Sequence, residues 1–359
     1  MRHVRGRIIE VETIGQFDRR LRLGATSMSG WHLQGVDLTE RGTALRSLDV
    51  AGALFLGCRL TEADAVSVRA RGAIVFPELP GLPIDTYRTT LYTPTELFGS
   101  GDYQDSLDAC AYAWSQQVRN LDVTLAQALH DHAIDDAVEQ YVVGRSLVGV
   151  MGGHSLRRGG TSYLQAAELG QRLAGAHTVA TGGGPGAMEA ANLGAWMRDR
   201  DAAELGEAVR MLGTVPSFTP SIGAWADAAF GVRDRFPDGA ESLGVPTWHY
   251  GHEPPNPFAT SIAKYFANPQ REAVLLQICN AGIVFLPGAA GTVQEIFTDA
   301  CENYYADESA TSPMVLVGRQ YWTETLPAWP LLQALASGRH MADRVHLVDT
   351  TDEVAALLT

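Results

Sequence analysis

Strand and helix patterns alternate from about residue 141 to the end of the chain, and this alternation limits the possible folds more than any other feature. Apolar runs predict strands at residues 146–153, 177–184, 212–218, 282–288, 313–318 and 344–349. Apolar residues at helical spacing predict helices at residues 161–175, 186–199, 271–281, 291–306 and 326–338. This order predicts a doubly wound α/β fold, in which helices cover both faces of a parallel sheet.

The earlier part of the chain has a different pattern. Residues 1–105 contain short β-type runs, and no helix of useful length is expected within 47–80, so we predict a smaller β-rich N-terminal region without an assigned role. We predict a helical connector at residues 106–140. Residues 141–359 are expected to form the domain of the nucleotide-binding type. Within that domain, residues 219–262 form an insertion rich in glycine, proline and aromatic residues. We expect an ordered flap beside the site; a packing or dimer arm is the alternative.

Composition excludes several classes of partner. A formal net charge of −14 argues against a nucleic-acid polymer or an anionic membrane, although one small phosphate ligand remains compatible with it. Four scattered cysteines lack the spacing of a zinc site, and no cofactor or metal is expected. The first residues lack the apolar run of a signal peptide, and no segment is apolar over the roughly 20 residues of a membrane span. We therefore expect a reduced, cytoplasmic protein.

Two glycine-rich turns follow predicted strands and precede predicted helices. The first places Gly182, Gly183, Gly184 and Gly186 in the segment TGGGPGAMEAANLGA, and the second is PGAAGT at 287–292. Glycine lets backbone N–H groups approach an anion closely, and a helix start favours negative charge. Two such turns at one sheet edge predict a phosphate site, whereas each turn alone could be only a tight connection. Gly152 and His154, at the end of strand 146–153, lie where residues can line the same pocket.

Glu295 and Arg271 are the two charged candidates for a role at the site. Thr292 and Glu295 have the spacing of a capping box, which would make Glu295 only a helix cap. Glu295 also lies one turn past the expected phosphate, where a carboxylate could stabilise positive charge on a sugar. Arg271 opens the predicted helix 271–281, a poor position for its charge unless it has a partner. A surface salt bridge is the alternative for Arg271.

Together these segments resemble the LOG family of Rossmann-like phosphoribohydrolases, which are often misannotated as lysine decarboxylases. The resemblance covers about residues 141–359 and is carried by TGGGPGAMEAANLGA, by NPQREA at 268–273 and by PGAAGTVQE at 287–295. Ala289 stands where the family motif has glycine, and Asn268 and Glu272 stand where it has Met and Lys.

The resemblance implies catalytic roles for Glu295 and Arg271. It also implies a set of substrate-binding residues: Gly152, His154, Gly182, Gly183, Gly184, Gly186, Glu189, Gly288, Ala289, Ala290, Gly291 and Thr292.

These observations predict a hydrolase that cleaves the N-glycosidic bond of a nucleoside 5′-monophosphate, giving free base and ribose 5-phosphate. The alternative is a non-catalytic protein that binds a nucleotide or another phosphorylated ligand, as a sensor or carrier. The resemblance further implies a homodimer or a higher homo-oligomer.

Overall fold

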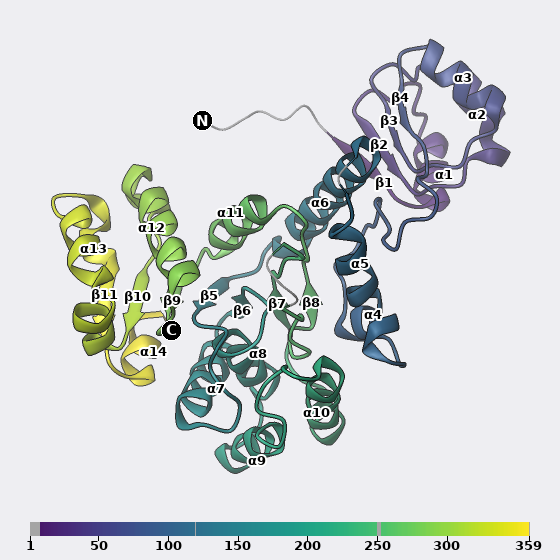
Figure 1. Cartoon of the computed structure of the whole chain (residues 1–359). Coiled ribbons are helices and arrows are strands. Elements are labelled where there is room, and N and C mark those ends of the chain that lie inside the picture. The colour runs from purple at the N-terminus through teal and green to yellow at the C-terminus, as the bar shows by residue number, and fades with distance from the viewer. Residues whose placement is uncertain (1–7, 119, 250–252, 359) are drawn as a thin grey trace. The chain divides into compact units, whose positions relative to one another are not determined.

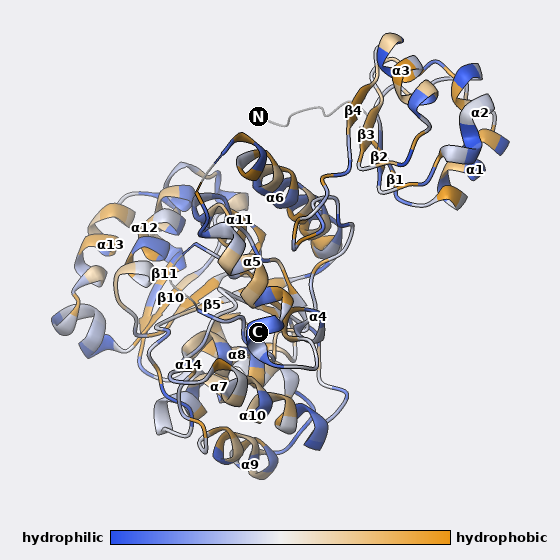
Figure 2. Ribbon diagram, turned by 45° about the vertical axis from the view of Figure 1, so that its right-hand side comes forward, coloured by the Kyte–Doolittle hydropathy of each residue, from blue (hydrophilic) through white to orange (hydrophobic). Residues whose placement is uncertain are grey.

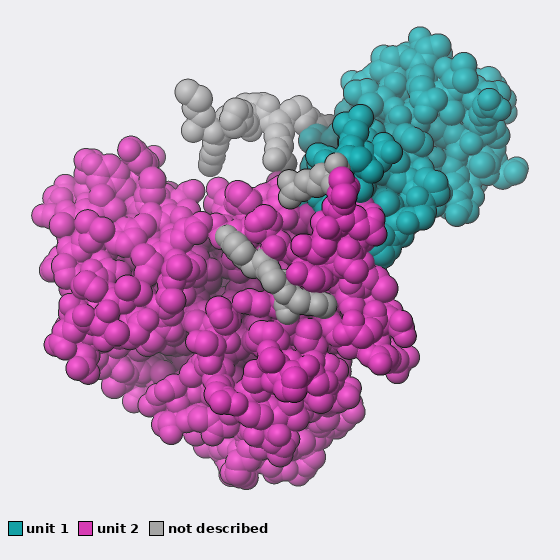
Figure 3. Space-filling view, viewed as in Figure 1, with its two compact units in different colours: residues 1–90, 119–137 teal, residues 91–118, 138–359 magenta. Residues whose placement is uncertain are grey.

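The computed structural model describes residues 8–118, 120–249 and 253–358. The chain divides into two compact units (Figure 3). Unit 1 comprises Met1–Thr90 and Arg119–Ala137, and unit 2 comprises Leu91–Val118 and Val138–Thr359.

Unit 1 is built on a parallel sheet in the order β1-β2-β3-β4, formed by Ile9–Val11, Trp31–Gln34, Leu54–Leu56 and Ile74–Phe76. Helices α1 (Ile14–Arg22), α2 (Gly42–Ser47) and α3 (Glu62–Ala70) follow the first three strands. Paired residues Ile9 and Trp31, His32 and Leu54, and Leu54 and Ile74 are separated by 22, 22 and 20 positions (31−9, 54−32 and 74−54). Unit 1 is therefore a stack of similar strand–helix coils.

Helix α3 contradicts the expectation that residues 47–80 contain no helix of useful length. Helix α3 has nine residues inside the segment 47–80, and the side chain of Thr61 caps it by accepting a hydrogen bond from the N–H of Asp64. Such a helix is hard to recognise because it is short and contains the β-branched residues Val66 and Val68, which favour strands.

Unit 2 confirms the prediction of a Rossmann-like parallel sheet. Its seven strands have the order β11-β10-β9-β5-β6-β7-β8, and every neighbouring pair is parallel. The strands are β5 (Leu147–Met151), β6 (Thr178–Thr181), β7 (Ser242–Gly244), β8 (Ser261–Ile262), β9 (Ile283–Phe285), β10 (Met314–Val317) and β11 (Val345–Val348). Strands β6, β7 and β8 follow one another on one side of β5. The chain then crosses back, and β9, β10 and β11 follow one another on the other side of β5. The crevice beyond the C-terminal ends of β5 and β9 is the usual ligand position in such sheets.

Helices of unit 2 cover the sheet on both sides (Figure 1). One group contains α7 (Thr161–Leu173), α8 (Ala187–Trp196), α9 (Ala202–Leu212), α10 (Ile222–Arg235) and α14 (Thr351–Leu358). The other contains α11 (Asn268–Ile278), α12 (Ala290–Tyr305) and α13 (Ala328–Ala336). Apolar residues concentrate in strands such as β5 and β10 between these groups (Figure 2).

Two shorter helices, α4 (Pro94–Phe98) and α5 (Leu107–Ser115), also belong to unit 2, and α6 (Leu121–Val142) crosses the boundary between the units. Helices α5 and α6 lie where the connector was expected, although the division of the chain into units assigns α5 to unit 2 and most of α6 to unit 1.

The strand predicted at 212–218 does not form. Leu212 ends helix α9, where Leu205, Ala208, Val209 and Leu212 form the buried face. The third strand is instead Ser242–Gly244, inside the segment interpreted as a flap. That segment supplies α10, β7 and β8 and buries Trp225, Trp248 and Phe258, so most of it belongs to the core of unit 2. Its residues 250–252 lie outside the described residues.

Candidate functional site

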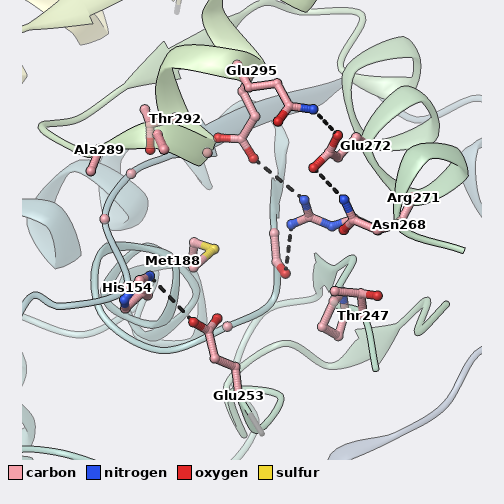
Figure 4. Close-up of a pocket in the computed structure, with 18 residues that line it drawn as sticks. His154, Met188, Thr247, Glu253, Asn268, Arg271, Glu272, Ala289, Thr292 and Glu295 are labelled. Carbon is pink, nitrogen blue, oxygen red and sulfur yellow. Dashed lines mark hydrogen bonds and ion pairs between the residues drawn. The ribbon is translucent and has the colours of Figure 1, made fainter. Parts of the chain in front are cut away.

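A cavity of about 480 Å³ opens at the crevice between β5 and β9 (Figure 4). Its wall comes from the loops after β5, β6, β7 and β9, together with the starts of α8, α11 and α12. Ten of the predicted site residues line it: Gly152, His154, Gly182, Gly184, Arg271, Ala289, Ala290, Gly291, Thr292 and Glu295. We refer to this cavity as the central pocket.

The start of helix α12 forms one side of the central pocket. Ala289 is the N-cap residue, and no side chain caps the helix. The first-turn N–H groups of a helix have no partner within the helix, so here they are available to an anion. Ala289 has φ −104°, so this position does not use the left-handed backbone that would favour glycine over alanine.

The capping role considered for Glu295 is contradicted by the position of the helix start. The helix begins at Ala290, which places Thr292 within the first turn and leaves no Thr292 side-chain cap. The Glu295 carboxylate instead faces the Arg271 guanidinium, with 3.7 Å between Oε1 and Nη1. Glu295 is therefore a pocket residue with a charged partner.

Arg271 is held in place by the backbone of two neighbouring loops. Its Nε donates to the carbonyl of Val245 at 2.6 Å, and its Nη2 donates to the carbonyl of Gly182 at 3.3 Å. The side chains of Arg271 and Glu295 are only 11% and 12% exposed. The surface salt bridge considered for Arg271 is thus replaced by a buried ion pair that joins α11 to α12.

Burial sets the protonation of Glu295. Loss of solvent raises the pKa of its carboxyl to about 7; the positive charge of Arg271 opposes the rise, and the nearby Glu272 adds to it. Near neutral pH the carboxyl is therefore divided between its charged and neutral forms, which suits a group that exchanges a proton or stabilises transient positive charge.

Glu272 lies beside this pair between two side-chain amides. Nδ2 of Asn268 donates to one carboxylate oxygen at 2.6 Å, and Nε2 of Gln294 donates to the other. All three residues line the central pocket. His154 and Glu253 form a separate pair, with 3.5 Å between Nδ1 and Oε1, and Figure 4 places them away from Glu272.

Three of the predicted glycines are required by close packing. A Cβ on Gly182 would come within 2.3 Å of the Arg271 guanidinium, and one on Gly288 within 2.2 Å of the Thr292 hydroxyl oxygen. A Cβ on Gly152 would meet the Cβ of Ala187 at 2.8 Å. Gly288 itself does not line the pocket. Larger residues would displace the Arg271 side chain or the start of α12, so these glycines shape the pocket through packing.

Gly183 and Gly186 were expected to bind the substrate, and the structure gives them other tasks. The N–H of Gly183 donates to Oγ1 of Thr181 at 3.0 Å, so it is not available to a phosphate. Gly186, with φ +75°, is the N-cap of α8 and packs against the backbone of Gly153 and His154. Neither residue lines the central pocket.

Glu189 is likewise directed elsewhere. It is fully buried, and its carboxylate accepts from Nε of Arg158 at 3.0 Å and from the same guanidinium's Nη2. Arg158 also donates to the carbonyl of Trp225 at 2.8 Å. The pair lines a neighbouring cavity and ties the loop after β5 to helix α10. A buried acid that is already paired and hydrogen-bonded has a structural role here.

A buried polar network supports the loop after β6. Asn256 donates through Nδ2 to the carbonyl of Gly184 at 3.2 Å and to Oδ1 of Asn192 at 3.0 Å, and the Asn256 N–H donates to Gly183. Thr181 donates to the same oxygen of Asn192 at 2.6 Å. These hydrogen bonds fix the backbone of the glycine-rich turn.

Sequence reasoning missed several lining residues: Met188, Pro246, Thr247, Glu253 and Gln294. Three of them, Pro246, Thr247 and Glu253, follow β7 in the segment interpreted as a flap, whose proline and aromatic content was the only available signal. Among the described residues, no group of three or more His, Cys, Asp or Glu side chains is arranged to hold a metal ion. No helix in the described ranges is long and apolar enough to cross a membrane.

Neither a protein-family model nor a curated protein matches the chain. Similar solved structures include the molybdenum cofactor binding protein from the phototrophic bacterium Rippkaea orientalis, with 15% identity and a TM-score of 0.38, covering 59% of this chain and 94% of that one. The Moco carrier protein from Chlamydomonas reinhardtii has 19% identity and a TM-score of 0.35, covering 59% and 95%. A further structure of the molybdenum cofactor carrier protein from that organism has 18% identity and a TM-score of 0.35, covering 59% and 94%.

Proposed function

We propose that the protein binds a phosphorylated small molecule of the nucleotide type in the central pocket. The observation that carries this proposal is the uncapped start of α12, which shares one cavity with the Arg271–Glu295 pair. Free N–H groups and the partial positive charge of the helix start favour a phosphate at Ala290, Gly291 and Thr292. The rest of the ligand then extends toward α11.

The spacing along α12 suits a phosphate followed by a sugar. Glu295 lies five positions after Ala290, which corresponds to about 7.5 Å along the helix axis at a rise of about 1.5 Å per residue. A ribose attached to a phosphate at the helix start would thus lie near the Glu295 carboxyl. Met188, Pro246 and Thr247 provide a mixed apolar and polar wall for the remaining part of the ligand.

Binding without chemistry is the simplest form of this function, and hydrolysis of the N-glycosidic bond is the second candidate. The raised pKa of Glu295, to about 7, and its contact with Arg271 favour the second candidate. Ionised Glu295 would stabilise positive charge on the sugar while water adds to C1′ and the departing base takes up a proton. The resemblance of PGAAGTVQE to the LOG-family motif points to the same reaction.

Ligand titration combined with product analysis separates these two functions. The panel consists of nucleoside 5′-monophosphates, the corresponding nucleosides and the molybdenum cofactor of the similar binding and carrier proteins. A ligand at about 100 times its Kd should stabilise the protein by about 2.7 kcal/mol, which a thermal-shift assay detects. Failure of every phosphorylated ligand to shift the melting temperature would contradict the proposal.

Release of free base decides whether the bound nucleotide is hydrolysed. If it is, Glu295→Gln should lower the rate by about 10²–10³-fold or more while the fold is kept. The wild-type rate should rise as pH increases through about 7, because the ionised carboxyl is the active form. Glu308→Gln, at an exposed position outside the pocket, is the matched control. Stabilisation by a monophosphate with no base released over a long incubation would leave binding alone.

A further inference from the structure

Glu272 presents an unusual set of acceptors at the end of the central pocket near α11. Its two carboxylate oxygens accept hydrogen bonds from Asn268 and Gln294, which lie on α11 and α12. A carboxylate offers about four lone-pair positions, and two are occupied here, so acceptor capacity remains toward the ligand.

The carboxylate also orients the two amides around it. Because an ionised carboxylate only accepts hydrogen bonds, Asn268 and Gln294 must turn their NH₂ groups toward it. Their carbonyl oxygens are thereby directed away from Glu272. The resulting group of side chains is rich in acceptors, and it lies in the same cavity as Thr247 and Glu295.

Glu272 and the two amides beside it lie where the base of a nucleotide bound in the central pocket would be expected. Figure 4 shows Thr292 and Ala289 on one side, Glu295 next to them, and Glu272 and Asn268 beyond Glu295. A ligand with its phosphate at the start of α12 and its sugar at Glu295 would place the next ring beside Glu272.

We propose that Glu272 determines ligand specificity by reading the paired donors of a 2-amino-4-oxopyrimidine ring, the N–H and adjacent NH₂ of guanine. This inference rests on the proposed function, because it takes a phosphorylated ligand in the central pocket as given. A carboxylate accepts from both donors at once, and charge-assisted hydrogen bonds of this kind are roughly twice as strong as neutral ones. Pterins carry the same donor pair and are the other source of this chemistry.

Other bases fit this acceptor group less well. Hypoxanthine keeps the ring N–H and lacks the amino group. Xanthine has a carbonyl in place of the amino group, which would face the carboxylate with a second acceptor. Adenine presents an unprotonated ring nitrogen at the equivalent position. Guanine offers a donor to each carboxylate oxygen of Glu272, whereas each of the other three bases lacks at least one of these donors.

Titration of the full-length protein with GMP, IMP, XMP and AMP tests the inference. GMP should bind at least about tenfold more tightly than IMP, because it donates one more hydrogen bond to the charged carboxylate. XMP and AMP should bind more weakly than GMP. A phosphorylated pterin tested beside GMP shows which of the two ring systems carrying this donor pair is preferred.

The variant Glu272→Gln keeps the size of the side chain and removes its charge. It should reduce the preference of GMP over IMP to less than about threefold, because GMP loses two charge-assisted hydrogen bonds and IMP loses one. Glu308→Gln, an exposed exchange of the same kind, should keep the wild-type preference. A merely structural role of Glu272 between α11 and α12 would weaken all nucleotides alike and leave their ratio unchanged.

The outcomes separate this inference from the proposed function. Equal affinities for GMP and IMP in the wild type would overturn the role of Glu272 and leave phosphate binding standing. If none of the phosphorylated ligands binds, the proposed function itself fails. The wild-type comparison needs no variant, so it remains decisive even if Glu272→Gln does not fold.

Discussion

Two carboxyl groups on helix α12 have raised pKa values, and burial is the main cause in both. Glu295 and Asp299 are separated by one helical turn, and loss of solvent raises their pKa values to about 7 and about 8. Asp299 is 4% exposed, and its Oδ2 has no hydrogen-bond partner within the described residues. Both groups are therefore stabilised in the neutral form by the fold.

Stability should reflect these pKa values with a definite sign. Because the folded-state pKa of Glu295 lies above its ordinary value of 4.5, its contribution is complete below pH 4.5 and is lost as pH rises through about 7. Relative to Glu295→Gln, the wild type should lose about 2 kcal/mol of unfolding free energy between pH 5 and pH 8. Asp299→Asn should show the same trend, with its loss centred higher, as the pKa of Asp299 is raised to about 8.

Urea unfolding at several pH values measures this difference. Glu308→Gln, which removes a carboxyl from an exposed position, should follow the wild type and serves as the control. Parallel stability curves for the wild type and Glu295→Gln across this range would contradict the raised pKa.

At the residue scale, the sequence singled out Glu295 and Arg271 but could not give their geometry, and the catalytic roles expected for them stay a prediction. Their residue types and the surrounding motif predicted roles at one site, and the structure brings them into one ion pair. The carbonyl partners of Arg271, on Val245 and Gly182, could not be predicted because they depend on how two loops meet in space. Glu189 was misassigned because its partner Arg158 lies 31 positions away in the chain.

Helix α12 is the element on which the proposed function depends. The sequence predicted it at 291–306, within one residue of the observed Ala290–Tyr305, because its apolar residues follow helical spacing. The capping box considered at Thr292 and Glu295 does not form, and a sequence cannot distinguish it from a mere Thr–Glu spacing. Whether the Thr292 side chain caps the helix depends on where the helix begins.

Gly291→Ala tests the role of the helix start. A Cβ on Gly291 would meet nothing within 4 Å and would project into open space at a residue that lines the central pocket. The substitution should leave the free energy of unfolding unchanged or raise it by up to about 1 kcal/mol, because alanine has a higher helix propensity than glycine. It should nevertheless weaken phosphate-ligand binding by about tenfold or more, because the methyl group obstructs the approach of a phosphate to the helix-start N–H groups.

Gly231→Ala provides a matched control on helix α10, where a Cβ also has nothing within 4 Å and the residue does not line the central pocket. It should give the helical gain in stability without any loss of affinity. Calorimetric titration and urea unfolding of both variants compare the two effects. Unchanged ligand affinity in Gly291→Ala would argue that the helix start does not contact the ligand.

At the scale of the whole molecule, the parallel sheet of unit 2 was predictable because alternation of strands and helices allows few other arrangements. The location of β7 and β8 was not, because these strands have three and two residues and lie among prolines and glycines. The coils of unit 1 were missed for a similar reason, since each strand has only three or four residues. The homo-oligomer implied by the family resemblance stays a prediction.

Distant segments of unit 2 are joined by a buried charge pair. Asp108 on α5 and Lys264 are both fully buried, and the Lys264 ammonium donates to Oδ1 of Asp108. Trp248 donates to the same oxygen at 2.8 Å, and the hydroxyl of Tyr103 donates to Oδ2 at 2.6 Å. The segment Leu91–Val118 is thus part of the unit that contains the central pocket.

Asp108→Ala should lower the free energy of unfolding by about 3–5 kcal/mol, because it leaves the Lys264 charge buried without its partner. The double variant Asp108→Asn/Lys264→Met removes both charges together and should recover a substantial part of this loss. Denaturant unfolding of the two variants checks the difference. A cost below about 1 kcal/mol for Asp108→Ala would show that the pair does not hold this segment in place.

A crystal structure of the protein soaked with a nucleoside 5′-monophosphate would show directly whether the start of α12 binds the phosphate. We expect phosphate oxygens about 3 Å from the N–H groups of residues 290–292, with the sugar beside the Glu295 carboxyl. A phosphate bound elsewhere, for example in the cavity of about 550 Å³ lined by Ser155, Arg157 and Thr351, would contradict it.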